Sequence, residues 1–229
     1  MKWSWRWRVA AAVLLVALLP VLWVVAHLAW WSFYNPTSTA FMDRRLAALR
    51  ETNVHAKLQY KWVPYARISA DLKRAVIAAE DAKFLDHEGF DWEGIREAYE
   101  KNQRRGKIVA GGSTISQQLA KNLFLSGERS AVRKVEEAVI TVLLEAVLSK
   151  RRIFEIYLNV IEWGEGVFGV EAAALHYFGV PAARLNADQA ARLAAMVPRP
   201  RFYDRKRDTP VLDRRVEIIL SRMQYADVP

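Results

Sequence analysis

The chain has 229 residues, of which 52% are hydrophobic and 26% are charged, a composition typical of a folded protein rather than a disordered or fibrous one. It contains no cysteine, which excludes disulfide scaffolds, thiolate zinc sites and cysteine nucleophiles. The net charge is +9. A basic chain of this kind suits anionic partners such as lipid phosphates, pyrophosphates or nucleic acid.

The amino-terminal segment has the pattern of a membrane anchor. Residues 9–33 carry no formal charge, and as a helix with a rise of about 1.5 Å per residue they exceed the roughly 30 Å hydrocarbon layer. Aromatic clusters flank this run, and the basic residues Lys2, Arg6 and Arg8 precede it. The positive-inside rule then predicts a cytoplasmic tail over 1–8, a transmembrane helix over 9–33 and a domain over 34–229 outside the cytoplasm. A cleaved signal peptide is the alternative, although the apolar run is long for one.

The remaining chain predicts one mainly α-helical domain. Capping residues mark the helix starts, and no alternating pattern of useful length predicts a strand. We expect the helix over 130–149 to be the central buried one, because its second half is apolar on nearly all sides. Shorter helices are expected over 150–158 and 169–177. The expected capping residues are Ser69 (with the helix ending at Glu80), Asp91, Thr114 with Gln117, Ser130, Asn186 with Gln189, and Thr209 before Pro210.

Two acidic positions are candidates for chemistry. Glu80 and Asp81 stand where an apolar helical stripe ends, and the charge of Asp81 together with partial burial would raise the pKa of Glu80, as in a general base or acid. An ordinary capping and salt-bridge role is the alternative. Glu137 follows Arg133 by four residues, which is the spacing of a simple helical ion pair. Because the helix turns fully apolar there, this carboxylate must be paired, neutralised or facing a cavity.

A glycine-rich turn and nearby basic residues suggest a place for phosphate. Residues 111–114 (Gly-Gly-Ser-Thr) lead into a helix and present backbone N–H groups and hydroxyls. The turn lacks the Gly-Lys-Ser/Thr end of a P-loop. Lys121, Arg129, Arg133 and Lys134 follow, although a solvated basic face is the commoner meaning of such a cluster. The four histidines are too scattered for a metal site built from sequence-local ligands.

Together these segments resemble the peptidoglycan glycosyltransferases of glycosyltransferase family 51. The similarity spans residues 68–203 and is closest to the monofunctional biosynthetic type, because the chain has no Ser-x-x-Lys with the Ser-x-Asn and Lys-Thr-Gly partners of a transpeptidase. Five motifs occur in the family's order, over residues 80–91, 111–122, 133–137, 153–159 and 169–179.

The resemblance implies a lysozyme-like helical fold that polymerises lipid II with inversion, and a role for each motif residue. Glu80 would be the base that deprotonates the acceptor hydroxyl, and Glu137 the second glutamate beside the diphosphate. Residues 104–109 would form a mobile flap, and Asp81, Phe84 and His87 would support the site. The substrate and phosphate contacts would come from Lys121, Arg129, Arg133, Ser113, Thr114, Gln117, Gln118 and Asn122.

The resemblance also implies the enzyme's surroundings. Mg²⁺ or Mn²⁺ would accompany the diphosphate, with Glu137 as a candidate ligand, and no organic cofactor is expected. The expected partners are lipid II, the growing glycan strand, membrane lipids and other cell-wall synthesis or division proteins, but no nucleic acid. The domain would be periplasmic, held at the inner membrane by a single span.

Two other functions remain open from the sequence. A lysozyme-like hydrolase or lytic transglycosylase would cut the same glycan with an acid, but it needs no cations for a leaving diphosphate, and its glutamate is typically followed by serine rather than by Asp81. A non-catalytic anchored scaffold would bind lipid phosphates or other wall enzymes. Intact carboxylates at Glu80 and Glu137 argue against the scaffold.

Overall fold

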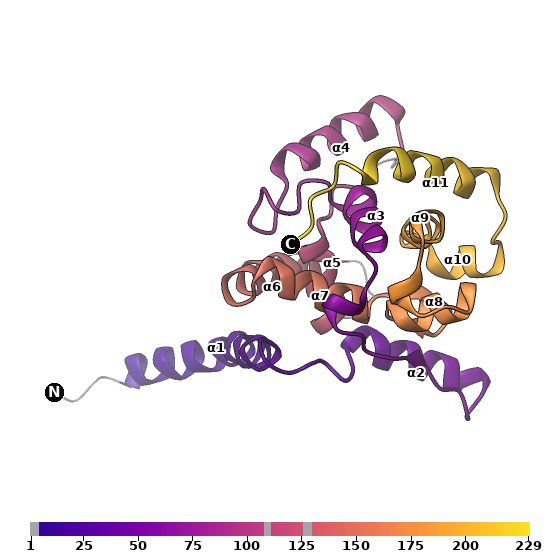
Figure 1. Ribbon diagram of the computed structural model, residues 1–229. Helices are drawn as coiled ribbons and strands as arrows, with labels where there is room; N and C mark the ends of the chain where they lie inside the picture. Colours follow the sequence, from indigo (N-terminus) through magenta and orange to yellow (C-terminus); the bar gives the residue numbers. More distant parts are fainter. Residues whose placement is uncertain (1–4, 108–110, 126–129) are drawn as a thin grey trace.

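The computed structural model describes residues 5–107, 111–125 and 130–229. It is mainly α-helical, as the sequence predicts (Figure 1). The helices are α1 (Trp5–Trp31), α2 (Ala40–Thr52), α3 (Ala70–Glu80), α4 (Trp92–Arg105), α5 (Ile115–Phe124), α6 (Ala131–Val147), α7 (Lys150–Val160), α8 (Val170–Phe178), α9 (Ala187–Met196), α10 (Pro200–Arg205) and α11 (Pro210–Met223). The shorter elements are the 3₁₀ helices η1 (Tyr65–Arg67) and η2 (Ala182–Arg184) and the strands β1 (Gln59–Tyr60), β2 (Glu162–Gly164) and β3 (Val167–Phe168).

Side-chain caps set the helix starts where the sequence predicts them. The hydroxyl of Ser69 accepts a hydrogen bond from the backbone N–H of Leu72 and begins α3. Reciprocal capping boxes begin α5 at Thr114 and α9 at Asn186. These caps satisfy backbone donors that have no partner inside the helix. The remaining predicted caps are also confirmed at Asp91, Ser130 and Thr209.

The three strands form one small sheet in the order β1-β3-β2. Strand β3 pairs with β1 in parallel, with Gln59 opposite Val167, and with β2 in antiparallel fashion, with Glu162 opposite Phe168. Strands of two or three residues are too short to leave an alternating pattern, which explains why the sequence did not predict them.

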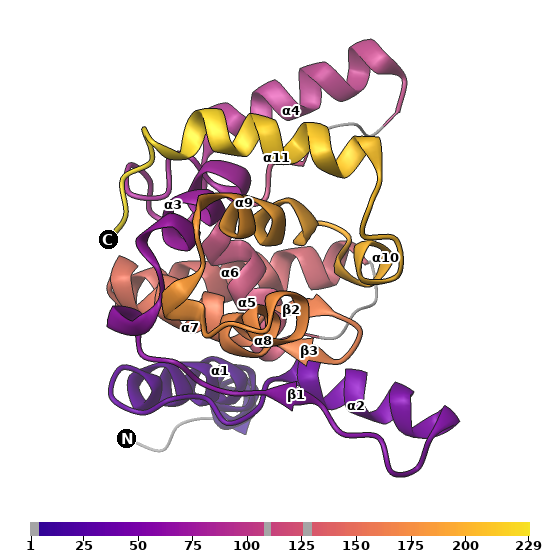
Figure 2. The same ribbon diagram turned by 45° about the vertical axis from the view of Figure 1, so that its right-hand side comes forward.

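The core of the domain lies around α7, α8 and α9. Helix α9 packs against both α3 and α11, while α7 packs against α5, α6 and α8 (Figures 1 and 2). Burying these faces removes large apolar surfaces from water, the main driving force for folding. Among the largest fully buried side chains are Trp163, Tyr157, Phe84, Phe154 and Phe168.

The prediction that α6 is the central buried helix is wrong. Its buried residues are restricted to one face, whereas Val132, Val135, Val139 and Val142 are exposed. Helix α6 packs against α5, α7 and α1, and these contacts leave its valine-bearing face open. An apolar composition on all sides of α6 therefore does not correspond to burial on all sides of the helix.

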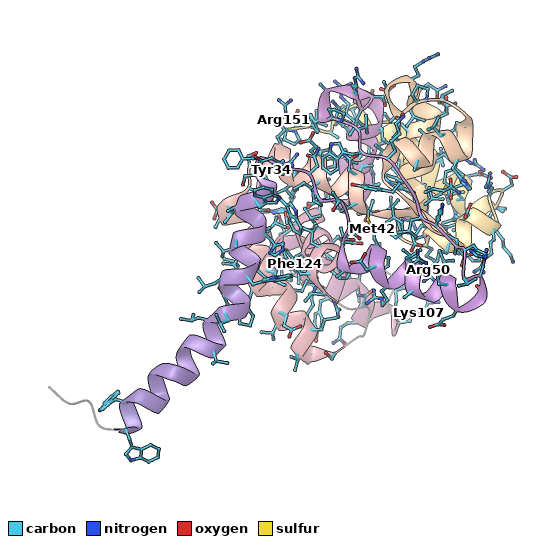
Figure 3. All side chains as sticks on the ribbon, turned by 90° about the horizontal axis from the view of Figure 1, so that it is seen from below. Tyr34, Met42, Arg50, Lys107, Phe124 and Arg151 are labelled. Carbon is cyan, nitrogen blue, oxygen red and sulfur yellow. The ribbon has the colours of Figure 1, made fainter. Side chains whose placement is uncertain are left out.

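Helix α1 projects from the domain, and its last turns contact it (Figure 3). The rings of Trp23 and Trp31 lie 5.6 Å and 5.4 Å from the ring of Phe124, at the end of α5, and Leu28 is fully buried. Over the part of the chain that the structure describes, none of the helices meets the length and hydropathy that crossing a bilayer requires.

Candidate active site

Glu80 is the last residue of α3 and lies at the edge of a hollow. Because Leu72, Ala75 and Val76 of α3 are buried and α3 packs against α9 and α11, the end of this helix is firmly placed. The hollow beside it has a volume of about 390 Å³. Its polar lining includes Glu80, Asp81, Lys83, Asp91, Glu97, Lys101, Ser113, Thr114 and Arg222, from α3, α4, α11 and the turns between them.

The environment of Glu80 makes it a stronger base than a surface glutamate. The half-buried carboxylate accepts a hydrogen bond from Gln118 Nε2 at 2.8 Å. Burial raises the pKa of Glu80, and the negative charge of Asp81 adds to the rise. The Gln118 hydrogen bond and the charges of Arg215 and Lys121 oppose that rise. A raised pKa strengthens the carboxylate as an acceptor for a hydroxyl proton.

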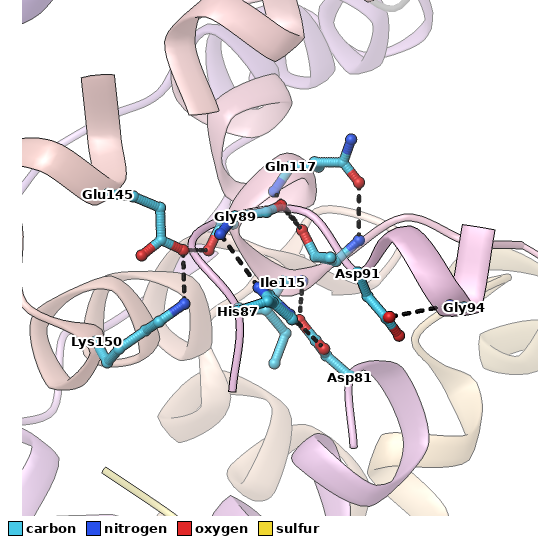
Figure 4. A network of polar contacts seen from close by, with 11 residues as sticks. Asp81, His87, Gly89, Asp91, Gly94, Ile115, Gln117, Glu145 and Lys150 are labelled. Carbon is cyan, nitrogen blue, oxygen red and sulfur yellow. Dashed lines mark hydrogen bonds and ion pairs between the residues drawn. The ribbon is translucent and has the colours of Figure 1, made fainter. Parts of the chain in front are cut away.

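Asp81 joins the segment after α3 to the start of α5 (Figure 4). Its Oδ2 accepts a hydrogen bond from the backbone N–H of Ile115, the first residue of α5, at 2.9 Å. Its Oδ1 lies 3.0 Å from His87 Nε2. His87 Nδ1 accepts a hydrogen bond from the backbone N–H of Gly89. The ring proton is therefore on Nε2, which donates a hydrogen bond to Asp81. The positive end of the helix dipole at the start of α5 stabilises the negative charge of Asp81. Through its bond to Ile115, Asp81 holds the start of α5 beside Glu80.

A second set of hydrogen bonds stabilises the turn at the start of α5. Thr114 Oγ1 donates to the carbonyl of Gly89 at 2.7 Å, and Gln117 Oε1 accepts from the backbone N–H of Thr114 at 3.0 Å. Gly89 has a φ of 91°, and a Cβ there would lie 2.8 Å from Thr141 Cγ2, so this position requires glycine. Thr114 lines the hollow. Gln117 is buried, and its contact with substrate stays a prediction.

Three more of the predicted site residues have places in or near this region. Ser113 lines the hollow. Asn122 is buried, and its Nδ2 donates to the backbone carbonyl of Gln118 at 2.7 Å. Phe84 is fully buried, with its ring 5.7 Å from that of Phe154. The structure thus places Phe84 in the core, where it supports the loop after Glu80.

Glu137 lies in a separate cluster on α6, where it is buried between two cations. Arg133 Nη1 lies 3.0 Å from Glu137 Oε2, and Lys134 Nζ contacts Oε1 of the same carboxylate. The helical ion pair that the sequence allows is therefore formed. Among the described atoms, the buried Nε of Arg133 has no hydrogen-bond partner. The guanidinium keeps a donor for a further acceptor.

The structure brings some predicted residues together and keeps others apart. The charge of Lys121 acts on Glu80. Lys121, Arg133 and Glu137 are not part of the lining of the hollow beside Glu80. The two groups are nonetheless on neighbouring elements, because α5, which carries Lys121, packs against α6. Arg129 lies outside the described residues. The predicted flap is wrong at its start, because residues 104 and 105 are the last residues of α4, and its residues 108–110 lie outside the described part of the chain.

Sequence reasoning missed three residues around Glu80. Arg215 and Arg222 come from α11, far along the chain, and only the packing of α11 on α3 brings them to the site. Tyr157 is fully buried on α7, and its hydroxyl donates to Gln118 Oε1 at 3.0 Å. The sequence carries no local signal for these contacts, although Tyr157 belongs to a motif that the resemblance includes.

The described residues do not fit a resident metal site. Among them, no three histidine, aspartate or glutamate side chains are grouped to hold an ion. Both carboxylate oxygens of Glu137 contact a cation, and its role as a ligand for Mg²⁺ stays a prediction. A divalent ion that arrives with a diphosphate substrate stays a prediction.

Comparison with known proteins identifies the family. A family model described as transglycosylase matches residues 47–224. The chain belongs to the transglycosylase family. It is 62% identical to a biosynthetic peptidoglycan transglycosylase of Laribacter hongkongensis, over 99% of each chain, and 61% identical to one of Methylobacillus flagellatus, over 97% of each. A third, from Dechloromonas aromatica, is 60% identical over 100% of each chain.

Membership confirms the resemblance inferred from the motifs. The matched region contains Glu80, Glu137 and all five motifs. The enzyme is therefore a glycosyltransferase of peptidoglycan synthesis, and its geometry can be interpreted in terms of that reaction.

Proposed function

We propose that the enzyme polymerises lipid II by a single inverting displacement in which Glu80 is the base. The acceptor is the 4-hydroxyl of a sugar, a poor nucleophile until its proton is removed. As its oxygen bonds to the donor's anomeric carbon, Glu80 takes the proton. The bond from that carbon to the lipid diphosphate breaks, and the diphosphate leaves with the electron pair. The product is a β-1,4 link made from an α-linked donor.

One observation carries this proposal: Glu80 lies at the rim of a hollow with burial raising its pKa. The hydrogen bond from Gln118 and the charges of Lys121 and Arg215 keep the carboxylate ionisable. A base needs both properties, since it must be charged before the step and attract a proton during it.

The leaving diphosphate accumulates negative charge, and pre-placed cations stabilise it. We assign Lys121, Arg129 and Arg133 to this task, with Lys134 beside them. The unpartnered Nε of Arg133 suits a phosphate oxygen. Glu137 would hold Arg133 and Lys134 in position rather than act as a second base, because both of its oxygens are already paired.

We further propose that residues 9–33 anchor the enzyme in the inner membrane, with residues 34–229 in the periplasm. Helix α1 has 27 residues, about 40 Å of helix. Its side chains at Leu19, Leu22 and Trp30 are exposed, as are the valines on the outer face of α6. These exposed apolar side chains would meet membrane lipids, where both lipid-linked substrates are confined. Other cell-wall proteins remain expected partners.

Labelled lipid II tests the proposed reaction. Incubated with the purified full-length enzyme in detergent, it should be converted into long glycan strands. Glu80→Gln should slow elongation by at least about 100-fold, whereas the exposed control Glu100→Gln should not slow it. Shortening of preformed strands would favour the hydrolase instead. Equal elongation by the Glu80→Gln variant would leave the scaffold as the better account.

The absence of cysteine makes the proposed topology easy to test. A cysteine introduced at the exposed Thr52 should react in intact spheroplasts with a maleimide that cannot cross membranes. A cysteine at Ser4 should react only after lysis. The reverse labelling pattern would contradict the proposed orientation, and labelling of both in intact spheroplasts would contradict a span between them.

A further inference from the structure

A chain of three side chains connects the buried centre of the domain to Glu80. Tyr157 Oη donates to Gln118 Oε1 at 3.0 Å, and Gln118 Nε2 donates to Glu80 Oε2 at 2.8 Å. The three residues come from α7, α5 and α3. The packing of α5 against α7 brings the first two together.

The direction of this chain is fixed at its inner end. Tyr157 is fully buried, and burial raises its pKa well above the ordinary value, so that its hydroxyl keeps its proton. The proton is directed to the amide oxygen of Gln118. An amide whose oxygen is held in this way must present its N–H₂ group on the other side, where Glu80 lies.

The position of Gln118 itself is also restrained. It occupies the first turns of α5, whose start is held by the capping box of Thr114 and by the bond from Ile115 N–H to Asp81. Its backbone carbonyl accepts the side-chain N–H of Asn122. These contacts place the backbone of Gln118, and the bond from the Tyr157 hydroxyl restrains the rotation of its amide.

We propose that Tyr157 is a positioning residue for catalysis, which orients the Gln118 amide so that it donates to Glu80 and keeps that carboxylate ionised. A flipped amide would turn its oxygen toward Glu80, where it repels a carboxylate and accepts a hydrogen bond only from the protonated acid. This inference rests on the proposed role of Glu80 as the base.

The other charges that face Glu80 come from several elements. Asp81 follows it in the chain, Lys121 lies on α5 and Arg215 on α11, and Lys83 and Arg222 line the same hollow. Removing the Tyr157 hydroxyl alters none of these charges. A change in the titration of Glu80 would therefore report the hydrogen-bond chain.

Tyr157→Phe removes one oxygen and keeps the buried ring. We expect the acid limb of the pH profile of kcat to move up by about one pH unit, because Glu80 loses an oriented donor. At pH values well above the limb, kcat should approach that of the parent. The matched control is Tyr65→Phe, at another buried tyrosine, whose hydroxyl donates instead to the backbone carbonyl of Pro229. It should leave the limb unchanged.

Two measurements separate this inference from its alternatives. In Gln118→Leu, adding Tyr157→Phe should cause no further shift, because Tyr157 acts through Gln118. A ¹³C NMR titration of labelled Glu80, without substrate, should show the same upward shift in Tyr157→Phe. If the parent is active but Tyr157→Phe changes neither the acid limb of kcat nor the NMR titration of Glu80, the role of Tyr157 is contradicted while the proposed function stands. Failure of the parent to extend lipid II would instead overturn the proposed function.

Discussion

Glu80 and Glu137 are both predicted functional carboxylates, yet their surroundings are opposite. Glu80 receives a neutral amide donor and faces a hollow, and the charges of Lys121 and Arg215 also act on it. Glu137 is buried and directly paired at both oxygens, with Arg133 and Lys134 of its own helix.

This difference suits the two residues to different tasks in the proposed reaction. Burial raises the pKa of Glu80, which strengthens it as a proton acceptor, whereas both oxygens of Glu137 are occupied by cations of its own helix. The paired carboxylate instead restrains the cations that hold it. In the proposed reaction, Glu80 would accept the proton and Glu137 would position Arg133 and Lys134.

Glu80→Gln should produce the largest effect. Glutamine has nearly the same shape but cannot take the acceptor's proton, so kcat for glycan elongation should fall by at least about 100-fold. The KM for lipid II should change little, because Glu80 acts in the chemical step. Steady-state kinetics with the Glu100→Gln control measure both. A drop confined to KM would contradict its role as base.

Glu137→Gln should lower kcat/KM by roughly 10-fold, because Arg133 and Lys134 lose the carboxylate that restrains them. The acid limb of the pH profile should not move. Glu136→Gln, at the exposed neighbouring position, supplies the matched control and should retain full activity. If the Glu137 variant instead lost the acid limb, the two glutamates would have been assigned the wrong way round.

Asp81→Asn should have an intermediate effect on activity and a clear effect on stability. Asp81 accepts hydrogen bonds from both Ile115 N–H and His87 Nε2, and an asparagine has a single oxygen to accept them. One buried donor should lose its partner, which costs about 1–3 kcal/mol in the free energy of unfolding. Urea unfolding measures this, and an unchanged midpoint would contradict the locking role of Asp81.

The smallest expected effects are on stability, with opposite signs at the two glutamates. Folding raises the pKa of Glu80, so the folded state favours its protonated form, and the charged form opposes folding at neutral pH. Glu80→Gln should therefore raise the free energy of unfolding at neutral pH. The gain should shrink as the pH falls through the folded pKa of Glu80. Glu137→Gln should lower that free energy by about 1–2 kcal/mol, because two cations lose their partner.

Thermal unfolding of the two variants and the parent, at neutral and at acid pH, checks both signs. If both substitutions lowered the free energy of unfolding at neutral pH, the charged form of Glu80 would stabilise the fold as that of Glu137 does. The contrast between the two sites would then fail.

Sequence alone predicted the features that depend on local chemistry. The caps at Ser69 and Thr114 follow from side chains that bond to backbone groups three residues away. The end of α3 at Glu80 follows from the loss of apolar periodicity. The structure confirms that end, and the bond from Ile115 N–H to Asp81, which the sequence did not predict, places the start of α5 beside it.

The features that depend on tertiary packing were beyond sequence reasoning. The outward face of α6 is apolar although it is exposed, so its composition suggested burial that packing does not provide. The charge of Arg215 acts on Glu80 only because α11 packs on α3. The link from Tyr157 to Gln118 joins α7 to α5 across 39 positions of the chain, and no local spacing encodes it.

The pH dependence of lipid II polymerisation tests the central claim most directly. With Glu80 as the base, activity should rise with pH along a limb above 4.5, the ordinary pKa of a glutamate, because burial raises the pKa of this side chain. In Glu80→Gln, the residual activity should lose that limb. A limb that persists unchanged in the variant would contradict the account.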